Sequence, residues 1–141
     1  MVIYELTHLF FRDANELIYS PKGLGLFYSY ESVKQAIQYF DTQPGFCDNQ
    51  DAFSIRERNV LGCIIDDEVF ESSIYLHSQN YEFEVEIELG LFGDEISARN
   101  KLAKYCTENT SLANAQGLIV EKILNKCIVE RREWTEGFVS E

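Results

Sequence analysis

The segment Tyr81-Glu82-Phe83-Glu84-Val85-Glu86-Ile87-Glu88-Leu89 alternates aromatic or aliphatic residues with glutamates without a break. This period of two predicts a β-strand, in which successive side chains point to opposite faces of a sheet. One face is expected to carry the apolar residues Phe83, Val85, Ile87 and Leu89. The other face is expected to carry a row of carboxylates about 6.6 Å apart, a spacing that is hard to satisfy internally: Glu82, Glu84, Glu86 and Glu88.

The end of this strand, Leu89-Gly90-Leu91-Phe92, repeats an earlier Leu24-Gly25-Leu26-Phe27. A strand-like segment precedes each copy, from Val2 to Phe11 in the first half and around Ile74-Tyr75-Leu76-His77 in the second, which echoes Ile3, Tyr4 and His8. Equivalent positions lie about 65 residues apart. We therefore expect a single α+β domain, residues 1–141, with an internal repeat of residues 1–65 and 69–133. The alternative is chance similarity between two amphipathic layouts.

A helix is expected after each Leu-Gly-Leu-Phe segment. In the first half, one helical face is formed by Val33, Ala36, Ile37 and Phe40. Ser29 or Glu31 suits its N-terminus, and Pro44-Gly45 its end. In the second half, Asp94 is a candidate N-cap, and the helical face consists of Ala98, Leu102, Tyr105 and Cys106. The polar segment Thr107–Gln116 is then expected to be a loop.

The remaining apolar segments predict further strands. Phe53–Arg58 alternates and is expected to form a strand. In the second half, Leu118–Glu121 and Cys127–Glu133 are predicted as two separate strands, although residues 120–128 also fit a helical face. Each half then has the order β-β-α-β. The predicted fold is an α+β protein with an antiparallel or mixed sheet and two helices packed on one face.

The composition narrows the function. Among 141 residues, 12 are basic and 24 acidic, giving a formal net charge of −12. This charge argues against direct binding to nucleic acid or to an anionic membrane. It suits either solubility alone or attraction of a basic protein. The four cysteines are widely separated, the N-terminus does not resemble a signal peptide, and no apolar run approaches the length of a membrane span. A cytoplasmic protein with reduced thiols is expected.

Two acidic groups are candidate partner-binding residues. The first is the carboxylate row of the alternating strand. The second precedes it and is expected in a loop: Asp66, Asp67, Glu68 and Glu71. The simpler interpretation of both is a solvated surface that prevents aggregation. Clustered carboxylates can bind Ca²⁺ or Mg²⁺, but the calcium-loop pattern is absent, so no metal or cofactor is expected.

No catalytic motif is present. The sequence contains no G-x-S-x-G, phosphate-binding loop, H-E-x-x-H or dinucleotide fingerprint. His8 and His77 both lie in apolar, strand-like segments, where a structural role is the default. The chain is therefore predicted not to be an enzyme. Two alternatives stay open: catalysis by His77 or a cysteine, and a small-molecule pocket lined by Trp134, Tyr4 and His8.

Five short motifs resemble those of a family of small bacterial domains of unknown function. They cover residues 3–60 and 128–138: Tyr4-Glu5-Leu6-Thr7-His8, Gly25-Leu26-Phe27-Tyr28-Ser29, Pro44-Gly45-Phe46, Phe53-Ser54-Ile55 and Trp134-Thr135-Glu136-Gly137-Phe138. This chain differs by about 65 additional residues between the fourth and fifth motifs, and these residues include the carboxylate row.

The resemblance implies no reaction. Members of this family look like the small proteins found beside bacterial polymorphic toxins. In kind, the chain is similar to the immunity proteins of contact-dependent growth inhibition systems. This similarity implies that it binds and neutralises one cognate toxin domain, such as a basic nuclease, and that the additional residues carry partner specificity.

Overall fold

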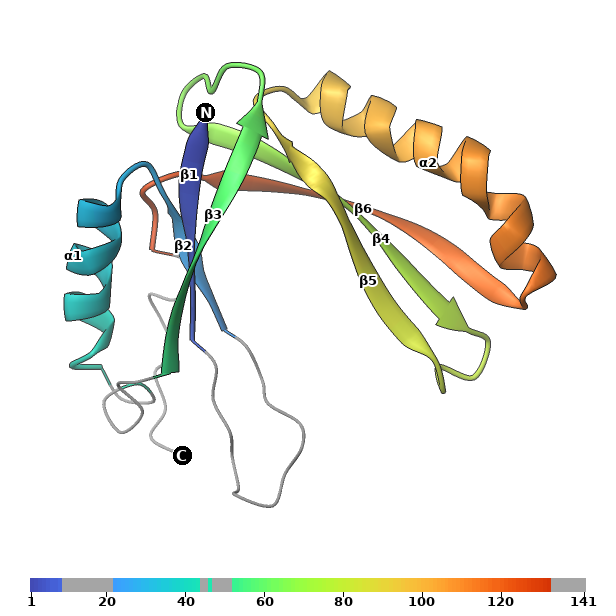
Figure 1. Ribbon diagram of the computed structural model, residues 1–141, viewed down its shortest axis with the longest axis horizontal. Helices are drawn as coiled ribbons and strands as arrows, with labels where there is room; N and C mark the ends of the chain where they lie inside the picture. The colour runs from blue at the N-terminus through green and yellow to red at the C-terminus, as the bar shows by residue number, and fades with distance from the viewer. Residues whose placement is uncertain (9–21, 44–45, 47–51, 133–141) are drawn as a thin grey trace. The chain divides into compact units, whose positions relative to one another are not determined.

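The computed structural model describes residues 1–8, 22–43, 46 and 52–132. Its elements are β1 (Val2–His8), β2 (Lys22–Phe27), α1 (Tyr30–Phe40), β3 (Phe53–Leu61), β4 (Glu68–Ser78), β5 (Glu84–Phe92), α2 (Glu95–Ala115) and β6 (Leu118–Ile128). The strand order is β2-β1-β3-β5-β4-β6. The β1–β2 and β4–β5 pairs are antiparallel and the β3–β5 pair is parallel. The predicted α+β class with a mixed sheet is confirmed (Figure 1).

The chain forms two compact units. The terminal unit comprises Val2–Arg58 and Ile128–Glu141, and the central unit comprises Met1 and Asn59–Cys127. Both boundaries fall within strands, in β3 and at the end of β6. Each unit therefore contains the β-β-α segment of one sequence half and the end of the last strand of the other half. The predicted single domain and internal repeat stay predictions.

The segments that each unit receives from the other sequence half, the end of β3 and the turn after β6, contact equivalent positions. In the central unit, the end of β3 pairs with β5 through Val60 opposite Leu91. In the terminal unit, the amide of Glu130 donates to the carbonyl of Leu26 in β2, at 2.7 Å. Leu26 and Leu91 hold the same place in the two Leu-Gly-Leu-Phe segments. Within each unit, this segment is therefore bonded to residues from the other half of the sequence.

The two Leu-Gly-Leu-Phe segments also form the same β-bulge. The register shifts at each one, so Leu24 and Leu89 have no counterpart on the neighbouring strand. The glycines that follow, Gly25 and Gly90, have φ of +138° and +151°. At each glycine, an added Cβ would lie within 3.3 Å of the ring of the phenylalanine two positions later. Glycine therefore permits both the bulge and the ring position.

The bulges correct one part of the predicted repeat. Gly25 lies opposite Leu6, and Gly90 lies opposite Ser72. Aligning the hairpins on these pairs makes Ile74 the counterpart of His8. The predicted echo between His8 and His77 is wrong, because the spacing between the bulge and each histidine differs.

Both helices begin where the sequence predicts. Ser29 caps α1 and accepts a hydrogen bond from the Ser32 amide at 3.1 Å, with Glu31 in the first turn. Asp94 caps α2 and accepts from the Ser97 amide at 2.7 Å. Helix α1 ends at Phe40, and the predicted stop at Pro44-Gly45 lies outside the described residues.

Helix α2 is longer than predicted, because residues 107–115 continue it and do not form a loop. Its polar side chains bond to the preceding turn: Thr107 Oγ1 donates to the Ala103 carbonyl and Asn109 Nδ2 to the Tyr105 carbonyl, both at 2.9 Å. Ala113 is buried, which anchors the last turns. Polar composition alone therefore did not identify the end of this helix.

Strand β6 also differs from its prediction. It is one continuous strand, Leu118–Ile128, and not two strands separated by a break. It neighbours β4 in the sheet, where Lys126 pairs with Glu68 at 2.7 Å. Sheet pairing thus overrides the helical spacing of its apolar residues.

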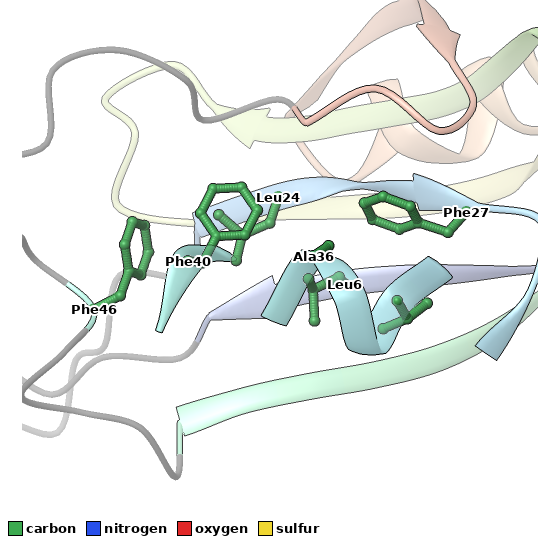
Figure 2. Packing of buried hydrophobic residues seen from close by; sticks show 7 residues of the cluster. Leu6, Leu24, Phe27, Ala36, Phe40 and Phe46 are labelled. Atoms are coloured by element: carbon green, nitrogen blue, oxygen red, sulfur yellow. The ribbon is translucent and has the colours of Figure 1, made fainter. Parts of the chain in front are cut away.

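The core of the terminal unit packs α1 onto β1 and β2 (Figure 2). Phe40 and Phe46 are fully buried, with ring centroids 5.5 Å apart. The rest of the cluster is aliphatic or aromatic: Leu6, Leu24, Phe27, Val33 and Ala36. The motif Trp134–Phe138 lies outside the described residues.

Candidate partner-binding face

The two faces of the β4–β5 hairpin have different surroundings. Ser72 Oγ donates to the carbonyl of Ala98 in α2 at 2.7 Å, so this side of β4 faces the helix. Ile74, two residues further, is fully buried. Alternation places Ser73, Tyr75 and His77 on the opposite side. There they lie across from Glu88, Glu86 and Glu84 of β5, respectively.

The carboxylate row is therefore present, but it is shorter and better satisfied than predicted. Glu84, Glu86 and Glu88 are exposed on one side of β5. The Tyr75 hydroxyl donates to Glu84, and the Ser73 hydroxyl donates to Glu86 at 3.0 Å. The expectation that these carboxylates are hard to satisfy internally is wrong for Glu84 and Glu86, because hydroxyls of the neighbouring strand reach them.

Glu82 does not belong to this row. Strand β5 begins at Glu84, and the hairpin turn occupies residues 79–83. The turn is closed by the Ser78 hydroxyl, which accepts from the Phe83 amide at 3.1 Å, and by the Asn80 side chain, which accepts from the Glu82 amide at 3.2 Å. The apolar side also differs from its prediction near the turn, since Phe83 and Val85 are 49% and 38% exposed.

The turn folds Tyr81 back over His77. Tyr81 has φ of +58°, a conformation that a tyrosine seldom adopts. Its ring stacks on the imidazole with centroids 4.4 Å apart and planes 4° apart. Tyr75 lies on the imidazole too, at 5.0 Å and 28°. This stack leaves His77 only 2% exposed, whereas Tyr81 is 56% exposed.

The histidine also faces β6. Its Nδ1 lies 2.9 Å from the Ser78 carbonyl, and its Nε2 lies 3.5 Å from a carboxylate oxygen of Glu121. The side chain of Glu121 is 55% exposed. We call these residues of β4, β5, β6 and the turn the acidic aromatic patch: Tyr75, His77, Tyr81, Glu84, Glu86 and Glu121.

The negative groups of the patch change the pKa of one side chain, the phenol of Tyr75. The pKa of Tyr75 is raised from 10.0 to about 12, chiefly because its hydroxyl donates to Glu84. The nearby groups Tyr81 and Glu121 act in the same direction. Tyrosinate formation is disfavoured because it would place a further negative charge among carboxylates.

The second acidic group is placed elsewhere. Asp66 and Asp67 form an exposed turn with φ of +56° and +60°, closed by a bridge between Ile65 and Glu68. Glu68 and Glu71 belong to β4 and not to a loop. Glu68 and His77 are nine positions apart along an extended strand, which is roughly 30 Å. The structure therefore does not bring this group together with the acidic aromatic patch.

The other candidate sites gain less support. His8 is fully buried and lies edge-on to Phe46 and Phe53, with centroids 4.8 and 4.9 Å away. In the described part of the chain, no group of three His, Cys, Asp or Glu residues could hold a metal ion. The central unit also contains a hollow beside the β4–β5 turn and the end of α2. It is lined by Gln79, Asn80, Asn114, Gly117, Leu118 and Ile119.

Sequence reasoning found Glu84 and Glu86 but missed Tyr75, Tyr81 and Glu121, and it named His77 only as a catalytic alternative. A signal was available for Tyr75, because it alternates with Ile74 and Leu76 as a strand face requires. Glu121 gave no such signal, since its place beside His77 depends on the pairing of β6 with β4.

Comparison with protein-family models, curated proteins and solved structures gives no match to this chain. No helix within the described ranges is long and apolar enough to cross a membrane.

Proposed function

We propose that this chain is a cytoplasmic immunity or inhibitor protein, without enzymatic activity, that binds and neutralises a cognate bacterial toxin domain. The partner is a basic protein, such as a nuclease domain, and not nucleic acid or a membrane. The acidic aromatic patch is the contact surface. The observation that carries the proposal is this exposed patch of carboxylates and stacked rings.

The distribution of charge supports a basic partner. The 27 residues from Asp66 to Phe92 contain eight acidic residues and no lysine or arginine. Glu84 and Glu86 therefore have no basic residue within their own hairpin. Such a surface attracts a basic protein at long range and raises the rate of association.

The patch also provides carboxylates held in place by hydrogen bonds and an exposed aromatic ring. The hydroxyls of Ser73 and Tyr75 fix two of the carboxylates, and Tyr81 presents an exposed ring beside them. Aromatic side chains are enriched among the residues that contribute most to protein interfaces. Ordered acceptors next to a ring lose little side-chain entropy when a partner binds.

The division of the chain supports the same interpretation. The segments that resemble the family of small bacterial domains, residues 3–60 and 128–138, nearly coincide with the terminal unit. The central unit corresponds to the additional residues and carries the whole acidic aromatic patch. A binder whose specificity resides in an added unit would have this arrangement.

The test is binding to the protein product of the adjacent upstream gene. The purified proteins should form a one-to-one complex whose association rate falls as salt increases, because charge attraction is screened. Inhibition of the partner's activity at equimolar concentration completes the test. A partner that binds equally fast at all salt concentrations, or no complex at all, would contradict the proposal.

A small-molecule-binding regulatory domain is the second candidate. The hollow lined by Gln79, Asn80 and Asn114 supplies amide donors and acceptors for a polar ligand. A ligand would raise the melting temperature of the protein. A thermal-shift screen that finds no stabilising compound would count against this candidate.

A further inference from the structure

One side of β5 is paired over only part of its length. Within the described ranges, β3 pairs with β5 at two positions, Val60 opposite Leu91 and Leu61 opposite Phe92. The register of this pair does not extend to residues 84–87, which β4 pairs on their other side. We call residues 84–87, on the side away from β4, the open edge of β5. Backbone groups at such an edge are a template for a further strand.

The backbone groups of Glu84 and Glu86 point toward the open edge. The Ser78 amide donates to the Phe83 carbonyl at 3.0 Å, so the backbone of residue 83 faces β4. Successive backbone groups of a strand point to opposite sides. Glu84 and Glu86 therefore direct their amides and carbonyls away from β4, whereas Val85 directs its own toward β4.

The other end of β5 gives the same assignment. The Gly93 amide donates to a carbonyl of β3 at 2.8 Å, so Leu91, two residues earlier, also faces away from β4. Leu91 lies opposite Glu71, and Glu86 lies opposite Tyr75, four residues further along β4. The extra residue of the bulge belongs to β5, so alternation along β4 is undisturbed. It gives Glu86 the same direction as Leu91.

The side chains beside the open edge determine which strand fits it. The exposed carboxylates of Glu84 and Glu86 lie on one face, and Val85, 38% exposed, lies on the other. A strand with basic residues at alternate positions places them beside the carboxylates, and its intervening apolar residues cover Val85. A second copy of this edge would place glutamates beside glutamates, which is destabilising. The charges therefore favour a basic strand over self-association.

We propose that the open edge of β5 binds the protein partner by strand addition, through an extended segment that alternates basic and apolar residues. Hydrogen bonds to the backbone of Glu84 and Glu86 hold the segment, and the two carboxylates select its basic side chains. The identity of the partner as a protein rests on the proposed function, whereas recognition of such a segment is tested separately.

The test is an NMR titration of the full chain with the capped peptide Lys-Val-Lys-Val-Lys and two N-methylated forms. One form is methylated at every lysine and the other at every valine. In a strand, the lysine amides point to one side and the valine amides to the other. With lysines opposite the glutamates, lysine amides bond to β5 in an antiparallel pair and valine amides do so in a parallel pair.

Strand addition predicts a position-dependent effect of methylation. The unmodified peptide should slow hydrogen exchange of the Glu84 and Glu86 amides roughly tenfold or more at saturation, because both amides become hydrogen-bonded. One N-methylated form should bind at least tenfold more weakly than the other, and its identity gives the strand direction. Equal affinities of the two methylated forms would overturn the proposal, since attraction between charges does not depend on which amides are methylated.

Two variants of one residue separate backbone pairing from charge. Glu86→Pro removes an amide that faces the open edge, a position at which an edge strand accommodates proline. Glu86→Gln removes the charge alone. The proline variant should bind the unmodified peptide at least threefold more weakly than the glutamine variant, and equal binding would reject the edge. The comparison of methylated peptides uses the natural chain and does not depend on the folding of either variant.

The two proposals can fail independently. If the peptide adds to the open edge but the chain forms no complex with the product of the adjacent upstream gene, the proposed function fails and strand addition stands. If that complex forms and its affinity is the same for Glu86→Pro and Glu86→Gln, strand addition fails and the proposed function stands.

Discussion

Tyr75 of β4 donates its hydroxyl hydrogen bond to Glu84 of β5, although in register Tyr75 lies opposite Glu86 and Glu84 lies opposite His77. The bond is therefore diagonal across the hairpin. It fixes the first carboxylate of β5 and, through the stacked Tyr75 ring, one side of His77. The acidic row and the aromatic stack thus form one connected structure.

This bond predicts an altered titration of Tyr75. Its pKa of about 12 lies above the ordinary 10.0, so the folded state keeps the proton longer than the unfolded state does. The resulting stabilisation is complete below pH 10.0 and is lost as pH rises from there to about 12. Tyrosinate absorbance, taken as the difference between the natural chain and Tyr75→Phe, measures this midpoint. Glu84→Gln should return it toward the ordinary value, and an unchanged midpoint would contradict the assigned cause.

Reversing charge on the acidic row should slow partner binding. Replacing both Glu84 and Glu86 by lysine should reduce the association rate with the basic partner tenfold or more, because electrostatic steering acts on the encounter. The double replacement Asp66→Lys and Asp67→Lys makes the same charge change at the distant turn and should have a smaller effect. Stopped-flow measurements at low salt provide the rates. Equal rates for the natural chain and the Glu84 and Glu86 double variant would remove the row from the interface.

The two β-bulges predict that the same substitution, glycine to alanine, lowers stability by different amounts at Gly25 and Gly90. Gly90→Ala should lower the free energy of unfolding by roughly 1–3 kcal/mol, because alanine is strained at positive φ. Gly25→Ala should cost more, since its Cβ would lie 2.6 Å from the backbone carbonyl oxygen of Arg131. Urea denaturation measures both values. A smaller cost at Gly25 would argue against the close approach of residue 131.

The N-terminus of α1 has a two-part cap. Ser29 accepts from the Ser32 amide, and the Ser32 hydroxyl donates to Glu130 at 2.7 Å. Ser29→Ala should lower the free energy of unfolding by about 1 kcal/mol. In a double-mutant cycle with Glu130→Ala, the two losses should be coupled by more than about 0.5 kcal/mol. Ser111→Ala, at an exposed position of α2, is the control. Additive losses in the cycle would show that Glu130 does not support the cap.

Burial predicts which apolar residues hold each unit together. Phe40→Ala in the terminal unit should cost about 3–5 kcal/mol, and Ile74→Ala in the central unit about 2–5 kcal/mol, because both side chains are fully buried. Ile96→Ala should change stability by less than about 0.5 kcal/mol, since this side chain is 71% exposed. Thermal denaturation of the three variants checks the order, and a large loss for Ile96→Ala would contradict it.

Local patterns predicted most of the secondary structure. The alternation of glutamates located β5, and the caps Ser29 and Asp94 located the starts of both helices, because such signals act over a few residues. The C-terminal end of α2 and the continuity of β6 were less predictable from the sequence. Side chains of Thr107 and Asn109 that bond within the helix extend α2, and sheet pairing makes β6 continuous, so neither boundary follows from composition.

The sequence by itself determined the α+β class, the starts of the helices and the side of β5 on which Glu84, Glu86 and Glu88 lie, since these depend on residue spacing alone. The tertiary structure decided that Tyr81 folds over His77, that Glu121 faces the same ring, and that Asp66 and Asp67 lie far from it. Those relationships depend on which strands pair and how the hairpin turn closes. Glu121 and His77 are distant in the chain, and no local pattern records the turn that brings Tyr81 over His77.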